Sequence, residues 1–120
     1  MSGAASCIFC KIVRGELPST KAHEDDTVLA FEDINPMAPT HTLIIPKQHI
    51  GRLQGGEDKA TLGHMVATAA RIAHAKGLAE GGYRLAINQG DHAGQLVEHV
   101  HLHLLGGEQL GKMCGGAAAY

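Results

Sequence analysis

The sequence predicts an α+β domain with a five-stranded, mostly antiparallel sheet, one short helix, and one long helix that covers one face of the sheet. Two observations lead to this fold class. Apolar residues recur at the i, i+3, i+4 spacing of a helix over residues 57–76, and strand-forming residues gather in five short runs bounded by turn-forming residues. The 120 residues are enough to bury one core, so we expect a single domain over residues 7–107, with tails at 1–6 and 108–120.

The N-terminal half is expected to form the short helix and three strands. Residues 7–15 carry apolar side chains at helical spacing and end in glycine, which predicts the short helix. Residues 21–24 and 27–33 flank a pair of aspartates and predict a hairpin. Residues 42–45 predict a central, apolar third strand that Pro46 ends, because proline has no backbone N–H to donate.

The C-terminal half is expected to contribute the long helix and two further strands. Gly77 follows the helical pattern and is placed to end that helix. Residues 83–88 predict the fourth strand, residues 89–95 a glycine-bearing loop and residues 97–105 the fifth strand, while residues 113–120 show no periodicity. Because the chain has few aromatic residues and an edge strand to pair, we expect a homodimer that continues the sheet or packs helix against helix.

The composition of the chain argues against several classes of binding partner and location. The formal net charge is −2, the ten lysines and arginines are scattered and aromatic residues make up 3% of the chain, so we expect no binding of polymeric nucleic acid. No apolar run approaches the roughly 20 residues of a membrane span, and the N-terminus lacks the pattern of a secretory signal, so we expect a cytoplasmic protein. Three cysteines do not suit a disulfide scaffold, whereas nine histidines are unusually many.

The stretch HVHLHLL, residues 99–105, concentrates the histidines. Its period of two places His99, His101 and His103 on one face of a strand and the intervening apolar residues on the other. Neighbouring histidines on that face are roughly 6.6 Å apart, whereas two nitrogens on one zinc ion are only about 3.4 Å apart. The spacing therefore favours a central reactive imidazole, a nucleophile toward phosphorus or a carbonyl carbon. A metal-buffering strand and solvent-facing histidines are the alternatives.

Two further groups of residues suit a binding site. The loop 88–95 contains glycines whose backbone N–H groups could approach an anion, with Asn88 as a side-chain donor, although a simple turn explains the same residues. Asp33 follows a strand that ends with Phe31, where its carboxylate could accept hydrogen bonds from sugar hydroxyls while Phe31 and Ile34 contact a base. A strand-ending acid is the alternative interpretation of Asp33.

The spacing Cys7-x-x-Cys10 permits both thiolates to bind one zinc ion, with two histidines elsewhere completing a tetrahedron. A redox pair and two buried structural thiols are the alternatives, and a redox pair would be expected to follow a strand. Cys114 is expected to be incidental. The remaining histidines are expected to be structural or solvent-facing: His23, His64, His74 and His92.

HVHLHLL is similar to the histidine triad signature His-φ-His-φ-His-φ-φ, in which φ is hydrophobic, and the chain resembles the histidine triad nucleotide-binding branch of the histidine triad (HIT) family. The resemblance extends over about residues 7–107 and includes IFCKIVRGELP, EDDTVLAFEDINPMAPTHTLIIPKQHI and YRLAINQGDHAGQLVEHVHLHLLGG. It implies a homodimer that hydrolyses purine nucleoside phosphoramidates and related nucleotidyl compounds at the α-phosphorus, through a nucleotidyl-histidine intermediate.

The resemblance also implies roles for individual residues. His101 matches the nucleophile, and His103, His41 and Asn88 match residues around the reacting phosphate. A structural zinc ion is implied at Cys7, Cys10, His49 and His99, with no metal required for catalysis. The positions implied to contact an AMP-like purine nucleotide are Ile8, Phe9, Ile12, Leu17, Phe31, Asp33, Ile34, Asn88, Gly94, Gln95, Leu96, His101 and His103.

The chain departs from the family pattern at two places. Leu96 stands where many relatives carry a hydroxyl side chain close to the phosphate, and the C-terminal sequence GKMCGGAAAY replaces the family's usual ending. Both departures concern the side of the site where the leaving group is expected. They leave open a purine-nucleotide-binding or scaffold protein with residual hydrolysis, and a zinc-dependent structural role.

Overall fold

The computed structural model describes residues 5–57 and 59–113 and confirms the α+β fold. The tails predicted at residues 1–6 and 108–120 therefore lie only partly within the described residues, and Cys114 lies outside them. Within the described residues, no helix is long and apolar enough to cross a membrane. The elements, in chain order, are α1 (Ile8–Val13), β1 (Lys21–Glu24), β2 (Val28–Glu32), β3 (Thr40–Pro46), α2 (Lys59–Ala75), β4 (Tyr83–Ile87), the 3₁₀ turn η1 (Asp91–Ala93) and β5 (Leu102–Gly106).

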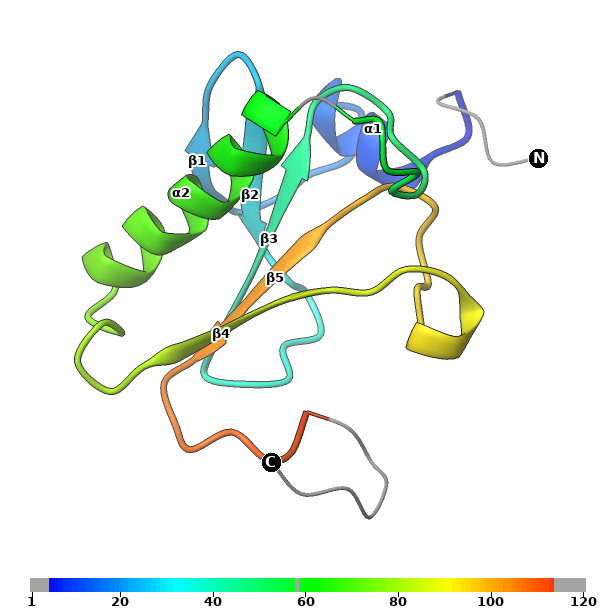
Figure 1. Cartoon of the computed structure of the whole chain (residues 1–120). Coiled ribbons are helices and arrows are strands. Elements are labelled where there is room, and N and C mark those ends of the chain that lie inside the picture. Colours follow the sequence, from blue (N-terminus) through cyan, green and yellow to red (C-terminus); the bar gives the residue numbers. More distant parts are fainter. Residues whose placement is uncertain (1–4, 58, 114–120) are drawn as a thin grey trace.

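The five strands form one antiparallel sheet in the order β1-β2-β3-β5-β4, with β1 and β4 at its edges (Figure 1). The predicted central position of the third strand is confirmed. Alternation along the strands sends side chains to two separate apolar clusters, as in β2, where Val28 and Ala30 face one cluster and Leu29 and Phe31 the other. The long helix α2 covers the first cluster, which contains the fully buried Ile44.

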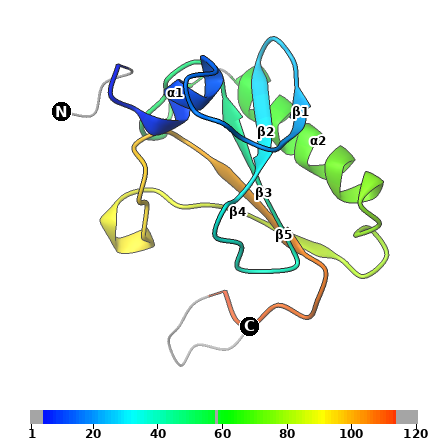
Figure 2. The same ribbon diagram turned by 180° about the vertical axis from the view of Figure 1, so that it is seen from behind.

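The short helix α1 covers part of the sheet face opposite α2. Figure 2 shows α1 in front of the sheet with α2 behind it. Phe9 of α1 is buried and its ring lies edge-on to that of Phe31, with centroids 5.6 Å apart. The two cysteines belong to the same cluster, because Cys7 is the N-cap of α1 and Cys10 lies within it. This face of the sheet carries the candidate site.

The predicted start of the fifth strand at residue 97 or 98 is wrong, because regular pairing in β5 begins only at Leu102. Leu102 pairs with the last residue of β4, Ile87, and with Ile44 of β3. Upstream of it, the backbone N–H of Val100 donates to Ile50 O, in the loop after β3, at 2.6 Å. The alternation of faces nevertheless extends through the whole stretch, since Val100 packs in the cluster under α2 and the histidines face α1.

Candidate active site

A cavity of about 800 Å³ lies beside α1 on the face of the sheet opposite α2. Its walls come from α1, the ends of β2 and β3, the segment after α1 and the loop between β4 and β5. Its polar interior is formed by His41, His101, His103, Asp33 and Asn88. The other lining residues are Ile8, Phe9, Ile12, Leu17, Pro18, Ser19, Phe31, Glu32, Ile34, Asn35, Met37, Leu43, Gly94, Leu96 and Val97.

His101 is held in one tautomer by the main chain. Its Nδ1 lies 2.7 Å from the carbonyl oxygen of His99, which can only accept a hydrogen bond, so Nδ1 carries the proton. In the neutral ring Nε2 is then the nitrogen with the free lone pair. The Phe9 ring lies nearly perpendicular to the imidazole, at an interplanar angle of 85° and a centroid distance of 5.1 Å, and restricts its rotation. The arrangement leaves His101 in a fixed orientation at the wall of the cavity.

His103 is held in the opposite tautomer by a relay of two hydrogen bonds. The backbone N–H of Met37 donates to His41 Nδ1 at 3.1 Å, so His41 carries its proton on Nε2. His41 Nε2 in turn donates to His103 Nδ1 at 2.9 Å, which leaves the proton of His103 on Nε2. His103 Nε2 is buried and has no hydrogen-bond partner within residues 5–57 and 59–113. A buried donor without a partner costs about 1–3 kcal/mol, so its presence beside the cavity indicates a binding role.

Burial keeps the two relay imidazoles uncharged at neutral pH. It lowers the pKa of His41, and burial together with the neighbouring imidazoles of His101 and His41 lowers the pKa of His103 to about 4. The Asp33 carboxylate opposes this shift at both histidines, and its Oδ2 lies 3.5 Å from His41 Nε2. The relay therefore supplies a neutral N–H donor next to His101.

The residues predicted to bind a nucleotide are brought together around this cavity, with the exception of Gln95. The Gln95 side chain is buried and bonds to the main chain around it. Its Oε1 accepts from the backbone N–H of Gly90 at 2.8 Å, and its Nε2 donates to the carbonyls of Gly51 and Val97, each at 3.0 Å. It shapes the loop that carries Gly94. Leu96, the next residue, lies at the cavity and is 93% exposed.

Cys7, Cys10, His49 and His99 form a compact cluster behind the cavity, with their ligand atoms all within 4.8 Å of one another. His99 Nδ1 lies 3.3 Å from Cys7 Sγ and 3.6 Å from Cys10 Sγ, and His49 Nδ1 lies 3.2 Å from Cys10 Sγ. Sulfur and nitrogen on a tetrahedral zinc ion are about 3.6 Å apart, so the donor set and its spacing fit zinc. His99 Nε2 donates to Pro46 O at 2.8 Å, which leaves Nδ1 free to act as a ligand.

The sequence interpretation missed Met37, whose backbone N–H fixes the tautomer of His41 and whose side chain lines the cavity. Met37 lies between Pro36 and Pro39 in the segment that joins β2 to β3. The position of Met37 in the sequence could have identified it. The loop that contains Met37 runs directly into the strand that carries His41, so its backbone N–H groups lie close to that histidine.

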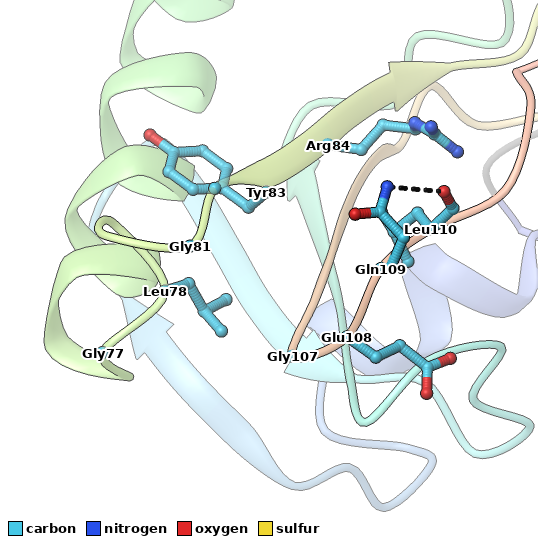
Figure 3. A pocket seen from close by; sticks show the side chains of 10 residues that line it. Gly77, Leu78, Gly81, Tyr83, Arg84, Gly107, Glu108, Gln109 and Leu110 are labelled. Carbon is cyan, nitrogen blue, oxygen red and sulfur yellow. Dashed lines mark hydrogen bonds between the residues drawn. The ribbon is translucent and has the colours of Figure 1, made fainter.

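A second, smaller cavity of about 560 Å³ contains none of the predicted site residues. It lies between the turn after α2 and the segment after β5, and Figure 3 shows Leu78, Tyr83, Arg84 and Glu108 around it. The hydrogen bond drawn in Figure 3 joins Gln109 Nε2 to Leu110 O. The residues around this cavity include neither histidine nor cysteine.

Comparison with known proteins agrees with this geometry. Residues 14–110 match the HIT domain. The chain is 50% identical over 112 residues to the purine nucleoside phosphoramidase of Escherichia coli K12, covering 92% of this chain and 94% of that protein. A HIT family hydrolase from Legionella pneumophila has a crystal structure with a TM-score of 0.84 and 50% identity, covering 87% of this chain and 95% of that one.

A zinc-bound histidine triad family protein from Mycobacterium smegmatis is a third similar structure. It has a TM-score of 0.79 and 37% identity, and the match covers 94% of this chain and 83% of that one. Sequence identity, coverage and fold agree across these comparisons, and the chain belongs to the HIT family.

Proposed function

We propose that this chain, a HIT-family hydrolase, cleaves purine nucleoside phosphoramidates and related nucleotidyl compounds at the α-phosphorus and releases a nucleoside monophosphate. The observation that carries the proposal is the pair of opposite tautomers at the cavity wall. His101 offers a lone pair on Nε2, and His103 beside it offers an unpartnered N–H, with the two ring centroids 4.9 Å apart. A nucleophile next to a hydrogen-bond donor suits attack on a phosphoryl group, whose oxygens gain charge.

In the first step, His101 Nε2 forms a bond to the α-phosphorus while the bond from phosphorus to the leaving group breaks. The leaving amine departs with its electron pair and takes up a proton from solvent. His101 then carries phosphorus on Nε2 and a proton on Nδ1, and the His99 carbonyl stabilises the resulting positive charge. His103 Nε2–H donates to a non-bridging phosphoryl oxygen throughout.

In the second step, water attacks the phosphorus of the nucleotidyl-histidine, and the bond to His101 Nε2 breaks. The nucleoside monophosphate leaves, a proton is released to solvent and His101 returns to its neutral form. Splitting the displacement in two gives the second step a good leaving group, since the phosphorylated imidazole is cationic before it departs.

The remaining lining residues suit the nucleoside. The apolar side chains from α1 and β2, including Phe9 and Phe31, would hold the base, and the Asp33 carboxylate would accept hydrogen bonds from ribose hydroxyls. Asp33 Oδ1 already accepts from the backbone N–H of Asn35 at 2.8 Å, which orients the carboxylate. Asn88 and the backbone at Gly94 would contact the phosphate.

We also propose a structural zinc ion, a homodimer and a cytoplasmic location. Zinc bound by Cys7, Cys10, His49 and His99 would fasten α1 to the segment that carries His101, and it would take no part in the reaction. A second copy of the chain would pair with the open edge of β4, which has a neighbour in the sheet on one side only. Sedimentation velocity of the wild-type chain would test the dimer, since a sedimentation coefficient of a monomer would contradict it.

The proposed activity is tested with adenosine phosphoramidate, a dinucleoside polyphosphate and an adenylyl-lysine as substrates. We expect release of AMP by the wild-type chain and by His74→Ala, a matched control on the exposed side of α2, and loss of turnover in His101→Ala. Rapid acid-free quenching followed by mass spectrometry should detect a nucleotidyl adduct in the wild type and none in His101→Ala. Retained turnover in His101→Ala would overturn the assignment of the nucleophile.

A second candidate function is nucleotide binding with only residual hydrolysis, which the exposed apolar Leu96 at the cavity favours. Leucine cannot donate a hydrogen bond to the phosphate or the leaving group. Calorimetry decides between the two functions, because tight binding of AMP with negligible turnover of all three substrates would favour the binding protein. Recovery of turnover in Leu96→Ser would then identify the missing hydroxyl as the cause.

A further inference from the structure

A second cluster of potential metal ligands lies on the far side of the sheet from the cavity. It consists of His23 on β1, Asp25 in the turn that follows and His64 on α2, whose ligand atoms lie within 4.8 Å of one another. Figure 1 shows the turn between β1 and β2 next to the first turns of α2. The sequence interpretation treated both histidines as structural or solvent-facing, and the proposed hydrolysis uses none of the three residues.

Both imidazoles converge on the same oxygen atom. His23 Nε2 and His64 Nε2 each lie 2.7 Å from Asp25 Oδ2. The other carboxylate oxygen, Oδ1, accepts from the backbone N–H groups of Thr27 at 2.8 Å and Val28 at 3.0 Å. These two hydrogen bonds fix the orientation of the Asp25 carboxylate, so that Oδ2 faces His23 Nε2 from β1 and His64 Nε2 from α2. The ion pairs that the described residues make with Oδ2 come from these two histidines.

We propose that His23, Asp25 and His64 form a binding site for a divalent transition-metal ion of the zinc and nickel class. Two imidazole nitrogens and one carboxylate oxygen are ligands that such ions prefer over magnesium or calcium. Ligand atoms about 2.1 Å from a metal lie about 3.0–3.4 Å apart, so each nitrogen must move from the carboxylate oxygen by only a few tenths of an ångström. The side chains are 27%, 30% and 36% exposed, which leaves the outer coordination positions to water.

Binding replaces two hydrogen bonds by metal–ligand bonds without any redox step. Each Nε2–H donates to the carboxylate, so each Nε2 must give up that proton to solvent before it can donate its lone pair to the metal. The ion then joins β1, its turn and α2. Because β1 is an edge strand that pairs with β2 alone among the described residues, this link would tie one edge of the sheet to α2.

The test uses the full chain loaded with one equivalent of zinc, so that the Cys7-containing cluster is occupied first, then incubated with Ni²⁺ and dialysed against metal-free buffer. We expect one nickel ion per chain in addition to the zinc, measured by elemental mass spectrometry. Asp25→Asn, which keeps the Oδ1 acceptor for the turn, and His64→Ala should weaken nickel binding by more than about tenfold. His74→Ala, which removes another histidine from α2, should bind nickel as the wild type does.

A site-resolved measurement keeps the proposal testable if a variant folds poorly. In the unsubstituted chain, paramagnetic Ni²⁺ should broaden the imidazole proton signals of His23 and His64 at substoichiometric amounts, before those of His74 and His92. Equal broadening of all four histidines, or no nickel retained after dialysis, would overturn the metal site and leave an imidazole–carboxylate hydrogen-bond cluster. Neither outcome depends on the proposed hydrolytic activity.

Discussion

Replacing His103 by leucine should separate catalysis from stability. His103 Nε2–H is buried without a partner among the described residues, which costs about 1–3 kcal/mol in the ligand-free fold. His103→Leu removes that cost together with the hydrogen bond to His41. The freed His41 Nε2–H retains Asp33 Oδ2, at 3.5 Å, as an acceptor. The opposing effects are of similar size, so the free energy of unfolding should change by less than about 2 kcal/mol.

The same substitution should strongly reduce turnover. Loss of one donor to a charge-bearing oxygen in a transition state costs about 2.7–4 kcal/mol, which is a reduction in kcat of about 10²–10³. KM should change less, because the nucleoside contacts remain. Steady-state release of AMP from adenosine phosphoramidate and urea denaturation provide the two measurements, with His74→Ala as the control. A variant with wild-type kcat, or one destabilised by more than about 3 kcal/mol, would refute the role assigned to His103.

Three further predictions concern stability. Burial lowers the pKa of His103 from 6.5 to about 4, so the unfolded chain binds more protons than the folded chain between pH 6.5 and pH 4. The free energy of unfolding should therefore fall as the pH falls through this range. If the urea midpoints of the wild type and His103→Leu depended equally on pH, this prediction would be contradicted. Ile44→Ala should cost about 2–5 kcal/mol in chemical denaturation, because Ile44 is fully buried beneath α2, whereas Ile44→Val should cost only about 0.5–1.5 kcal/mol. Zinc should raise the thermal midpoint of the wild type relative to a chelator and leave that of His49→Ala nearly unchanged, and an equal rise in both would argue against His49 as a ligand.

The order and type of the secondary-structure elements could be predicted from the sequence because periodicity is a local property. The helical spacing over α2 and the run of apolar strand-forming residues in β2 each reflect which side chains must leave water. The alternation at Val100, Leu102 and Leu104 was predicted correctly for the same reason, even though strand pairing begins only at Leu102. Pairing depends on a neighbouring backbone, and Val100 instead donates to Ile50 O outside the sheet.

The position of α1 could not be predicted in this way. Its apolar face requires burial, but six helical residues do not specify which surface they cover. Packing of Phe9 on Phe31 and His101 decides it, and these partners are far apart in the sequence. Once α1 is placed, this helix and its N-cap contribute both cysteines to the cluster that also contains His49 and His99. The same helix forms part of the apolar wall of the cavity.

Residue spacing was enough to establish that three histidines alternate with core residues and that the central one is suited to chemistry. What each imidazole can do follows from contacts between segments that are distant in the sequence. The carbonyl of His99 accepts a hydrogen bond from His101 Nδ1 and so keeps the ring proton on that nitrogen, and the relay from Met37 through His41 keeps the proton of His103 on Nε2. A tautomer depends on which donor or acceptor lies within about 3 Å of a ring nitrogen, and for His103 that partner comes from a different strand. Residue spacing fixes the face of the strand on which a side chain lies, whereas packing between distant segments fixes which ring nitrogen of a histidine carries the proton.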